Sequence, residues 1–215
     1  MTSRTLRTPR ELRDAGLIAP EQVPALDAVA ARYAIAIPPA LEALIDRNDP
    51  HDPIARQFVP DAAEIDVRPE ELADPIGDNA HSPVEGIVHR YPDRVLFKLT
   101  HICAVYCRFC FRREMVGPGK PNGLSAEAHA LALDYIAAHP EIWEVILTGG
   151  DPLVASAWLL AGTMRALAEI DHVKVLRVHT RVPIASPELV TSEMVNALRV
   201  KGKPTYIAVH VNHPR

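Results

Sequence analysis

Three cysteines lie within one stretch of eight residues, and the rest of the chain contains no other. Cys103, Cys107 and Cys110 have the spacing C-x3-C-x2-C. An odd number of cysteines, in a chain whose N-terminus lacks the apolar run of an export signal, argues against a disulfide framework and favours a reducing cytoplasm. We therefore predict that the three thiols are metal ligands or nucleophiles.

Three explanations of this spacing are open. A structural zinc site needs four closed ligands; His101 could be the fourth, but the second half of a usual zinc finger is missing. The thiols could also be buried residues without a chemical role, although chance rarely places a chain's only cysteines at ligand spacing. The third explanation is an iron–sulfur cluster held by three thiolates, which leaves one iron open for a ligand. We favour this explanation because it accounts for three cysteines rather than four.

The cysteines follow the first of four predicted strands. Strand-like apolar runs alternate with segments of helical spacing after Asp93, which predicts βαβ units and a parallel sheet. The predicted strands lie in residues 94–100, 143–148, 173–180 and 205–212, and the predicted helices lie in residues 125–139, 155–170 and 192–200. No G-x-G-x-x-G follows the first strand, which weakens a dinucleotide-binding interpretation.

The N-terminal part of the chain differs in composition from the rest, because it contains many of the 20 prolines. Thr8 to Glu11 reads as a capping box with proline at the first helical position. Further helices are predicted from Pro20 to about Tyr33 and in residues 38–46. We expect residues 1–88 to form a helical wrapping segment and residues 89–215 to form the α/β core.

Polar side chains gather at the C-terminal ends of all four predicted strands. Because residues two apart share a face of a strand, Arg177 and His179 should lie on one face of the third strand. The pairs Lys98 with Thr100 and His210 with Asn212 repeat this pattern, and Thr148 precedes a G-G-D-P turn. Strand ends can be polar only because they approach solvent, but in a (β/α) barrel this rim carries the chemistry. Four polar strand ends in series favour a site.

The composition fits a soluble globular protein. The chain has 215 residues, of which 48% are hydrophobic and 23% charged, with a formal net charge of -4. The acidic balance gives no support to a nucleic-acid binder. No apolar run approaches the ~20 residues that a membrane span needs. We expect a cytoplasmic protein without nucleic-acid or membrane partners.

The cysteine spacing after the first strand of a βα series resembles the radical S-adenosylmethionine superfamily. In that family the open iron binds S-adenosylmethionine, and an electron from the [4Fe-4S] cluster cleaves it to a 5′-deoxyadenosyl radical. The resemblance implies that Cys103, Cys107 and Cys110 hold the cluster. The turn of Gly149, Gly150 and Asp151 resembles the family's glycine-rich segment, which lines the methionine amino group.

Four segments resemble lysine 2,3-aminomutase and its close relatives more narrowly, from about Asp74 to the last residue. They are HRYPDRVLFKLTHICAVYCRFCFRR, LTGGDPL, RVHTRVPI and HVNHP. The resemblance implies a partial (β/α) barrel and an isomerase that uses pyridoxal phosphate. Such an aminomutase moves the α-amino group of an amino acid, most often L-lysine, to the β-carbon.

The same resemblance implies roles for individual residues. Arg112 would bind the substrate carboxylate, for which a planar guanidinium is suited. His179 and Arg181 would lie beside S-adenosylmethionine. The residues implied near pyridoxal phosphate are Arg90, Tyr91, Arg94 and His210. The implied partners are a small amino acid, a flavodoxin- or ferredoxin-type electron donor and a second copy of the chain.

The sequence departs from this family in two respects. Phe109 stands where lysine 2,3-aminomutases usually have histidine, and an aromatic residue is closer to the branch that modifies elongation factor P. The family's pyridoxal lysine lies beyond Arg215, so the chain looks C-terminally truncated. Among its own lysines only Lys98 lies near the C-terminal end of a strand. We expect no pyridoxal lysine in this chain, and a partial chain that only binds the cluster and S-adenosylmethionine is an alternative.

Overall fold

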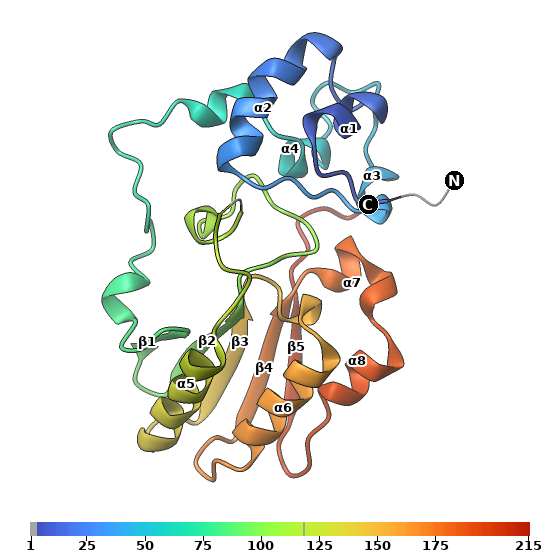
Figure 1. Ribbon diagram of the computed structural model, residues 1–215. Helices are drawn as coiled ribbons and strands as arrows, with labels where there is room; N and C mark the ends of the chain where they lie inside the picture. The colour runs from blue at the N-terminus through green and yellow to red at the C-terminus, as the bar shows by residue number, and fades with distance from the viewer. Residues whose placement is uncertain (1–3, 118) are drawn as a thin grey trace.

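The computed structural model describes residues 4–117 and 119–215, and its centre is a five-stranded sheet (Figure 1). The strands are β1 (Ile87–Tyr91), β2 (Arg94–Thr100), β3 (Glu144–Gly149), β4 (Val175–Thr180) and β5 (Thr205–Val209). They lie side by side in chain order. β2 to β5 are parallel and β1 pairs antiparallel with β2. The expected α/β fold with four parallel strands is confirmed.

Helices connect the parallel strands and cover one face of the sheet, as Figure 1 shows. They are α5 (Ala126–Ala138), α6 (Ala157–Ala168) and α8 (Ser192–Ala197), with the short α7 (Val182–Ala185) after β4. The side chains of Ser125, Ser156 and Thr191 cap the three longer helices. Each cap satisfies a backbone N–H that the first helical turn leaves without a partner.

The hydrophobic core lies between the sheet and these helices. Phe97 and Leu99 of β2 face it, together with Leu147, Leu176 and Val178 of the next two strands. Because side chains alternate along a strand, the residues between them face the other side of the sheet. Lys98, Thr148, Arg177 and His179 are therefore on the face that the helices leave open.

The strand β1 was not predicted from the sequence. It has five residues, and His89 and Arg90 interrupt its apolar pattern. It forms because the Tyr91–Arg94 turn folds it back on β2 in an antiparallel hairpin. The hairpin brings Arg90, Tyr91 and Arg94 to the edge of the open face.

The N-terminal residues form a helical layer at the C-terminal ends of the strands (Figure 1). Its helices are α1 (Pro9–Asp14), α2 (Val23–Arg32), α3 (Pro39–Glu42) and α4 (Ala55–Phe58). The predicted capping box of α1 is present, with Pro9 at the first helical position. Within residues 4–117 and 119–215, short 3-10 turns lie along the whole chain, at Pro20–Gln22, Ala62–Ile65, Asn79–His81, Arg113–Met115, Pro152–Val154 and Pro187–Leu189. No helix in the described part of the chain is long and apolar enough to span a membrane.

The helical layer has its own hydrophobic core. Leu12, Ile37, Ile54 and other N-terminal residues pack with Val105, which lies between the first two cysteines, and with Ala185 at the end of α7. One core thus contains residues from both parts of the chain. This packing holds the cysteine segment against the N-terminal layer.

Candidate functional site

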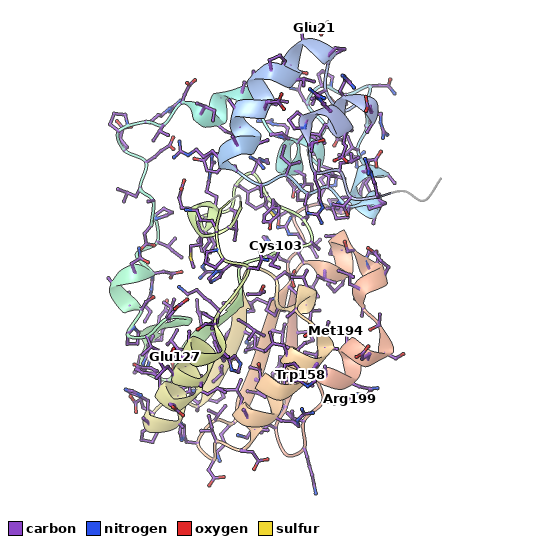
Figure 2. All side chains as sticks on the ribbon, in the orientation of Figure 1. Glu21, Cys103, Glu127, Trp158, Met194 and Arg199 are labelled. Carbon is purple, nitrogen blue, oxygen red and sulfur yellow. The ribbon has the colours of Figure 1, made fainter. Side chains whose placement is uncertain are left out.

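The cysteine loop, residues 101–115, lies between the sheet and the helical layer, as the position of Cys103 in Figure 2 shows. The Tyr106 N–H donates to the Ala36 carbonyl (3.3 Å), and the Arg108 N–H donates to the Gln57 carbonyl (2.8 Å). The Arg108 side chain donates to the Ala34 carbonyl (2.8 Å). The helical layer therefore fixes the backbone of the loop around the second cysteine.

A pair of charges completes this attachment. The Arg108 guanidinium donates to both carboxylate oxygens of Glu64, at 2.9 and 2.5 Å. Both side chains are nearly buried, with exposed fractions of 9% and 12%. A bidentate pair of this kind fixes both the position and the plane of the guanidinium.

A cavity of about 280 Å³ opens beside the loop, and all three cysteines line it. Most of the site residues expected from the sequence line the same cavity. They are Arg112 from the loop, Gly149, Gly150 and Asp151 after β3, His179 and Arg181 from β4 and its end, and His210 after β5. The fold thus gathers residues from four strand ends around the cysteines.

The cysteines are free thiols in this cavity. Burial raises the pKa of the Cys103 thiol above its usual range, and nearby Asp151 adds to the effect. Burial also raises the pKa of Cys107 to about 11, against the opposing charge of Arg181. Both groups are therefore protonated at neutral pH when no metal is bound, and ligation must displace their protons.

The side chains around the cysteines bear on whether the site would hold a cluster or a single ion. Within the described residues, no three His, Cys, Asp or Glu side chains come together closely enough to hold one metal ion. His101, the candidate fourth zinc ligand, lies in a different cavity with Arg7 and Lys120. The thiols of a four-iron cluster stand further apart than those around one zinc ion, because each binds a different iron. Three free thiols around one open cavity fit a cluster.

The turn after β3 brings backbone close to the cysteine loop. Gly149 has φ +107°, and a Cβ at this position would lie 2.5 Å from the Thr100 carbonyl oxygen. A Cβ on Gly150 would run into the Ile102 carbonyl oxygen, one residue before the first cysteine. Only glycine fits at these two positions. The two glycines therefore set the distance between the turn and the cysteine loop.

Asp151 is a buried carboxylate that joins the ends of β3 and β4. It accepts hydrogen bonds from the Thr180 hydroxyl (2.7 Å) and from the N–H groups of Arg181 (2.7 Å), Val182 (3.2 Å) and Leu153 (3.1 Å). Burial raises its pKa, and these hydrogen bonds oppose the shift. These hydrogen bonds fix the Asp151 carboxylate in the wall of the cavity.

Arg181 and His210 lie together in the wall of the same cavity. The guanidinium is 2.7 Å from His210 Nδ1 and stacks on the rings of Phe58 and Phe109 at about 5.5 Å. Burial and the charge of Arg181 lower the pKa of His210. The predicted strand 205–212 is too long, because β5 ends at Val209. His210 and Asn212 nevertheless lie on one side, as predicted, since both contact Arg181 Nη2, at 2.7 and 3.5 Å.

A second cavity, of about 270 Å³, adjoins the first. It is lined by Arg90, Tyr91 and Arg94, three of the residues expected together near pyridoxal phosphate. The two cavities share Phe111, Arg112, Thr148 and His179. His210 lines the cavity of the cysteines and not this one. The residues expected near pyridoxal phosphate thus separate into two neighbouring groups, with Arg112 at the boundary.

Sequence reasoning missed Asp78 and Glu64. Asp78 lines the second cavity and accepts from Arg112, while Glu64 pairs with Arg108. Both lie in the proline-punctuated segment before β1, where no helical or strand periodicity predicts which side chains turn inward. The sequence carries only an indirect signal for these two carboxylates: a buried arginine needs a carboxylate partner, so Arg108 and Arg112 each implied an acidic residue nearby.

Comparison with known proteins agrees with this geometry. The family model described as "Radical SAM superfamily" matches residues 97–215. L-lysine 2,3-aminomutase of Clostridium subterminale is 41% identical over 180 residues, which are 84% of this chain and 43% of that protein. The enzyme of the same name from Acetoanaerobium sticklandii is 36% identical over 209 residues, 97% of this chain and 50% of that protein.

A protein of Aquifex aeolicus named putative L-lysine 2,3-aminomutase is 34% identical over 209 residues, which are 97% of this chain and 56% of that protein. The chain spans about half the length of the curated relatives it matches. The family model covers more than half of the chain, including the cysteine loop and the glycine turn. The chain therefore belongs to the radical SAM superfamily, whose cofactors are a [4Fe-4S] cluster and S-adenosylmethionine.

Proposed function

We propose that this chain carries the cluster-binding and S-adenosylmethionine-binding part of an aminomutase that moves the α-amino group of an amino acid to its β-carbon. The observation that carries the proposal is the meeting of two cavities at Arg112. One holds the three cysteines and the other holds Arg90, Tyr91 and Arg94. A reaction that needs two cofactors and one substrate requires such adjoining spaces.

When bound, the cluster and S-adenosylmethionine would supply the radical that removes a substrate hydrogen, and pyridoxal phosphate would carry the amino group. Cys103, Cys107 and Cys110 would hold the cluster. The turn of Gly149 and Gly150 would allow the methionine part of S-adenosylmethionine to approach the backbone.

Arginine side chains would orient the charged groups. Arg181 would face S-adenosylmethionine from the wall that it shares with His210, and His179 would stand between the two cavities. Arg112 would bind the substrate carboxylate, while Arg90 and Arg94 would face the phosphate of pyridoxal phosphate. The arginine fork suits both anions because it donates two parallel hydrogen bonds.

L-lysine is the substrate we favour, because the relatives at 34–41% identity carry lysine 2,3-aminomutase names. Phe109 contacts His210 edge to face, with ring centroids 6.4 Å apart, so the residue between the last two cysteines lies in the site. Phe109 is closer to the branch that modifies elongation factor P. A protein-attached lysine and glutamate, which belong to neighbouring branches, are the alternative substrates. The reductant would be a flavodoxin or ferredoxin type of protein in the cytoplasm, and copies of the chain could associate.

A zinc-stabilised binding module is the weaker alternative. It needs a fourth ligand close to the cysteines, and His101 lies in a different cavity. A chain that binds the cluster and S-adenosylmethionine without turnover is the other alternative, because the chain offers no lysine that resembles the family's pyridoxal lysine.

Anaerobic reconstitution with iron and sulfide tests the proposal. We expect a brown protein with about four irons, whose spectrum changes when S-adenosylmethionine is added. Replacing any one of the three cysteines by alanine should abolish reductive cleavage of S-adenosylmethionine under dithionite. A colourless protein that takes up zinc instead of iron would contradict the cluster.

The substrate is tested by mass spectrometry of β-amino products from L-lysine, L-glutamate and lysine-containing peptides. A β-lysine product supports lysine, whereas cleavage of S-adenosylmethionine without any amino acid product supports the binding-only alternative. Borohydride reduction with pyridoxal phosphate and peptide mapping tests the attachment: an adduct on Lys98 would contradict our prediction that this chain has no pyridoxal lysine.

A further inference from the structure

One buried carboxylate, Asp78, contacts both Arg112, which lines the two cavities, and Arg90, which lines the second cavity. Its Oδ2 accepts from Arg112 Nε at 3.0 Å and lies 2.9 Å from Arg112 Nη2. Its Oδ1 lies 3.4 Å from Arg90 Nη2. The side chain of Asp78 is 5% exposed and that of Arg112 is 10% exposed. The contact is therefore a buried ion pair rather than a surface one.

The geometry of this pair leaves part of Arg112 available. Asp78 binds the side edge of the guanidinium, formed by Nε and Nη2. In the part of the chain that the structure describes, no protein acceptor contacts Nη1, so the end edge of Nη1 and Nη2 remains open. The guanidinium also lies over the Phe111 ring, 4.6 Å from its centroid. One edge and one side of the guanidinium are thus held, while a second carboxylate can bind the other edge.

Asp78 is itself held firmly. Its N–H donates to Asp74 Oδ1 at 2.9 Å, and the next N–H, of Asn79, donates to Asp74 Oδ2 at 2.8 Å. The Ser82 hydroxyl donates to the Asp78 carbonyl at 2.8 Å. Gly77, with φ +69°, allows the turn that points Asp78 inward. Residues 74–82 therefore form a rigid turn with one carboxylate on its inner side.

The charges around Asp78 explain why it keeps this position. Arg112 and Arg90 contact it directly, and the buried ammonium of Lys98 is attracted to it. Asp74 and Glu85 are further carboxylates that act on Lys98, and the oxygens of Asp74 accept backbone N–H groups. Asp78 is thus the negative charge shared by three buried or half-buried cations.

We propose that Asp78 is a positioning residue that presents the open edge of Arg112 to the substrate carboxylate and links this edge to Arg90. The inference rests on the proposed function, because it takes a substrate with a free carboxylate. An arginine that is already held in the binding orientation loses little side-chain freedom when the ligand arrives. The preference for substrates with a free carboxylate would then depend on Asp78, which the substrate does not contact.

The test compares L-lysine with L-lysinamide, which lacks only the carboxylate charge. Calorimetric titration of each into the anaerobic protein, loaded with the cluster and S-adenosylmethionine, requires no turnover. In the wild-type protein we expect L-lysine to bind at least about tenfold more tightly than the amide. In Asp78→Asn this preference should fall to about threefold or less, because a neutral amide holds the guanidinium less firmly.

Three further measurements separate positioning from support of the fold. The affinity for S-adenosylmethionine and the electron paramagnetic resonance spectrum of the reduced cluster should not change in Asp78→Asn. Asp78→Glu should regain part of the preference for L-lysine. Asp14→Asn, which alters an exposed ion pair with Arg13, is the matched control and should keep the wild-type preference.

Each outcome decides the inference. An equal loss of affinity for both ligands in Asp78→Asn would make Asp78 a structural residue and overturn the proposal. A wild-type protein that does not distinguish lysine from its amide would also overturn it, because Arg112 would then not bind the carboxylate. Reductive cleavage of S-adenosylmethionine tests the proposed function separately: a protein that prefers the carboxylate but does not cleave S-adenosylmethionine would contradict the function and leave the role of Asp78 supported.

Discussion

Replacing Arg108 by methionine should loosen the cysteine loop from the helical layer. The substitution keeps most of the apolar stem but removes the guanidinium, which makes two hydrogen bonds to Glu64 and one to the Ala34 carbonyl. The Glu64 carboxylate, 12% exposed, would then lose its main partner. Because Arg108 lies between Cys107 and Cys110, the loss acts directly on two of the proposed cluster ligands.

The expected cost follows from the burial of the pair. Breaking a buried ion pair by removing one partner typically costs about 3–5 kcal/mol. Arg113 remains 3.6 Å from Glu64 and compensates part of the charge. We therefore expect the free energy of unfolding to fall by about 3 kcal/mol, the lower end of this range. Arg13→Met is the control: its pair with Asp14 has exposed fractions of 41% and 66%, so its loss should cost about 0–1 kcal/mol.

Urea unfolding of the metal-free protein, followed by circular dichroism, measures both variants. A double-mutant cycle with Glu64→Gln isolates the pair, and we expect a coupling energy of at least about 1 kcal/mol. The reconstituted Arg108→Met protein should also release iron to a chelator faster than the wild type. A coupling energy below about 0.5 kcal/mol would refute the argument, because the pair would then not hold the loop.

Three other predictions concern separate features. Burial lowers the pKa of Lys98 below its usual 10.5, so Lys98→Met should raise the melting temperature by about 2–4 °C at neutral pH. Lys98 binds its proton more tightly in the unfolded chain than in the folded one, so the gain in melting temperature should shrink as pH rises toward 10.5. A gain in melting temperature that does not depend on pH would contradict this prediction. Gly150→Ala should displace the Ile102 carbonyl and abolish the spectral response to S-adenosylmethionine, whereas Gly162→Ala, in open space on α6, should stabilise by about 0.5–1 kcal/mol. Val209→Lys, on the exposed β5, should reduce self-association in sedimentation velocity; an unchanged distribution would show that this edge does not pair.

The regular part of the fold could be predicted from the sequence because its signals are local. The Ser125 cap precedes α5, and the apolar runs of β2 to β4 stand next to helices of clear period. The alternation of Arg177 and His179 with buried neighbours also holds, as Leu176 and Val178 face the core. Periodicity reports which face of an element is buried, and β4 shows it most clearly, because its fully buried residues alternate with less buried ones.

The connections that complete the site could not be predicted in the same way. Asp78 and Glu64 each act through an arginine more than 30 residues away in the chain, from a segment without regular structure. Spacing motifs identified the cysteines and the glycine turn, because residues that act together within one short loop need a fixed spacing in the sequence. The partners that hold those motifs in place depend on tertiary contacts, which no local pattern encodes.

The core of the helical layer has a consequence for the way the protein is made. This core joins residues near the N-terminus, such as Leu6 and Ile45, to Val105 and Ala185. Ala185 follows Ile45 by about 140 residues, so at about 5–20 residues per second the ribosome needs roughly 7–28 s to supply it. Most of the buried members of this core lie between Leu6 and Phe58, so they can pack against one another before Ala185 is synthesised. The attachment of the helical layer to α7 is thus among the last contacts of this core that can form.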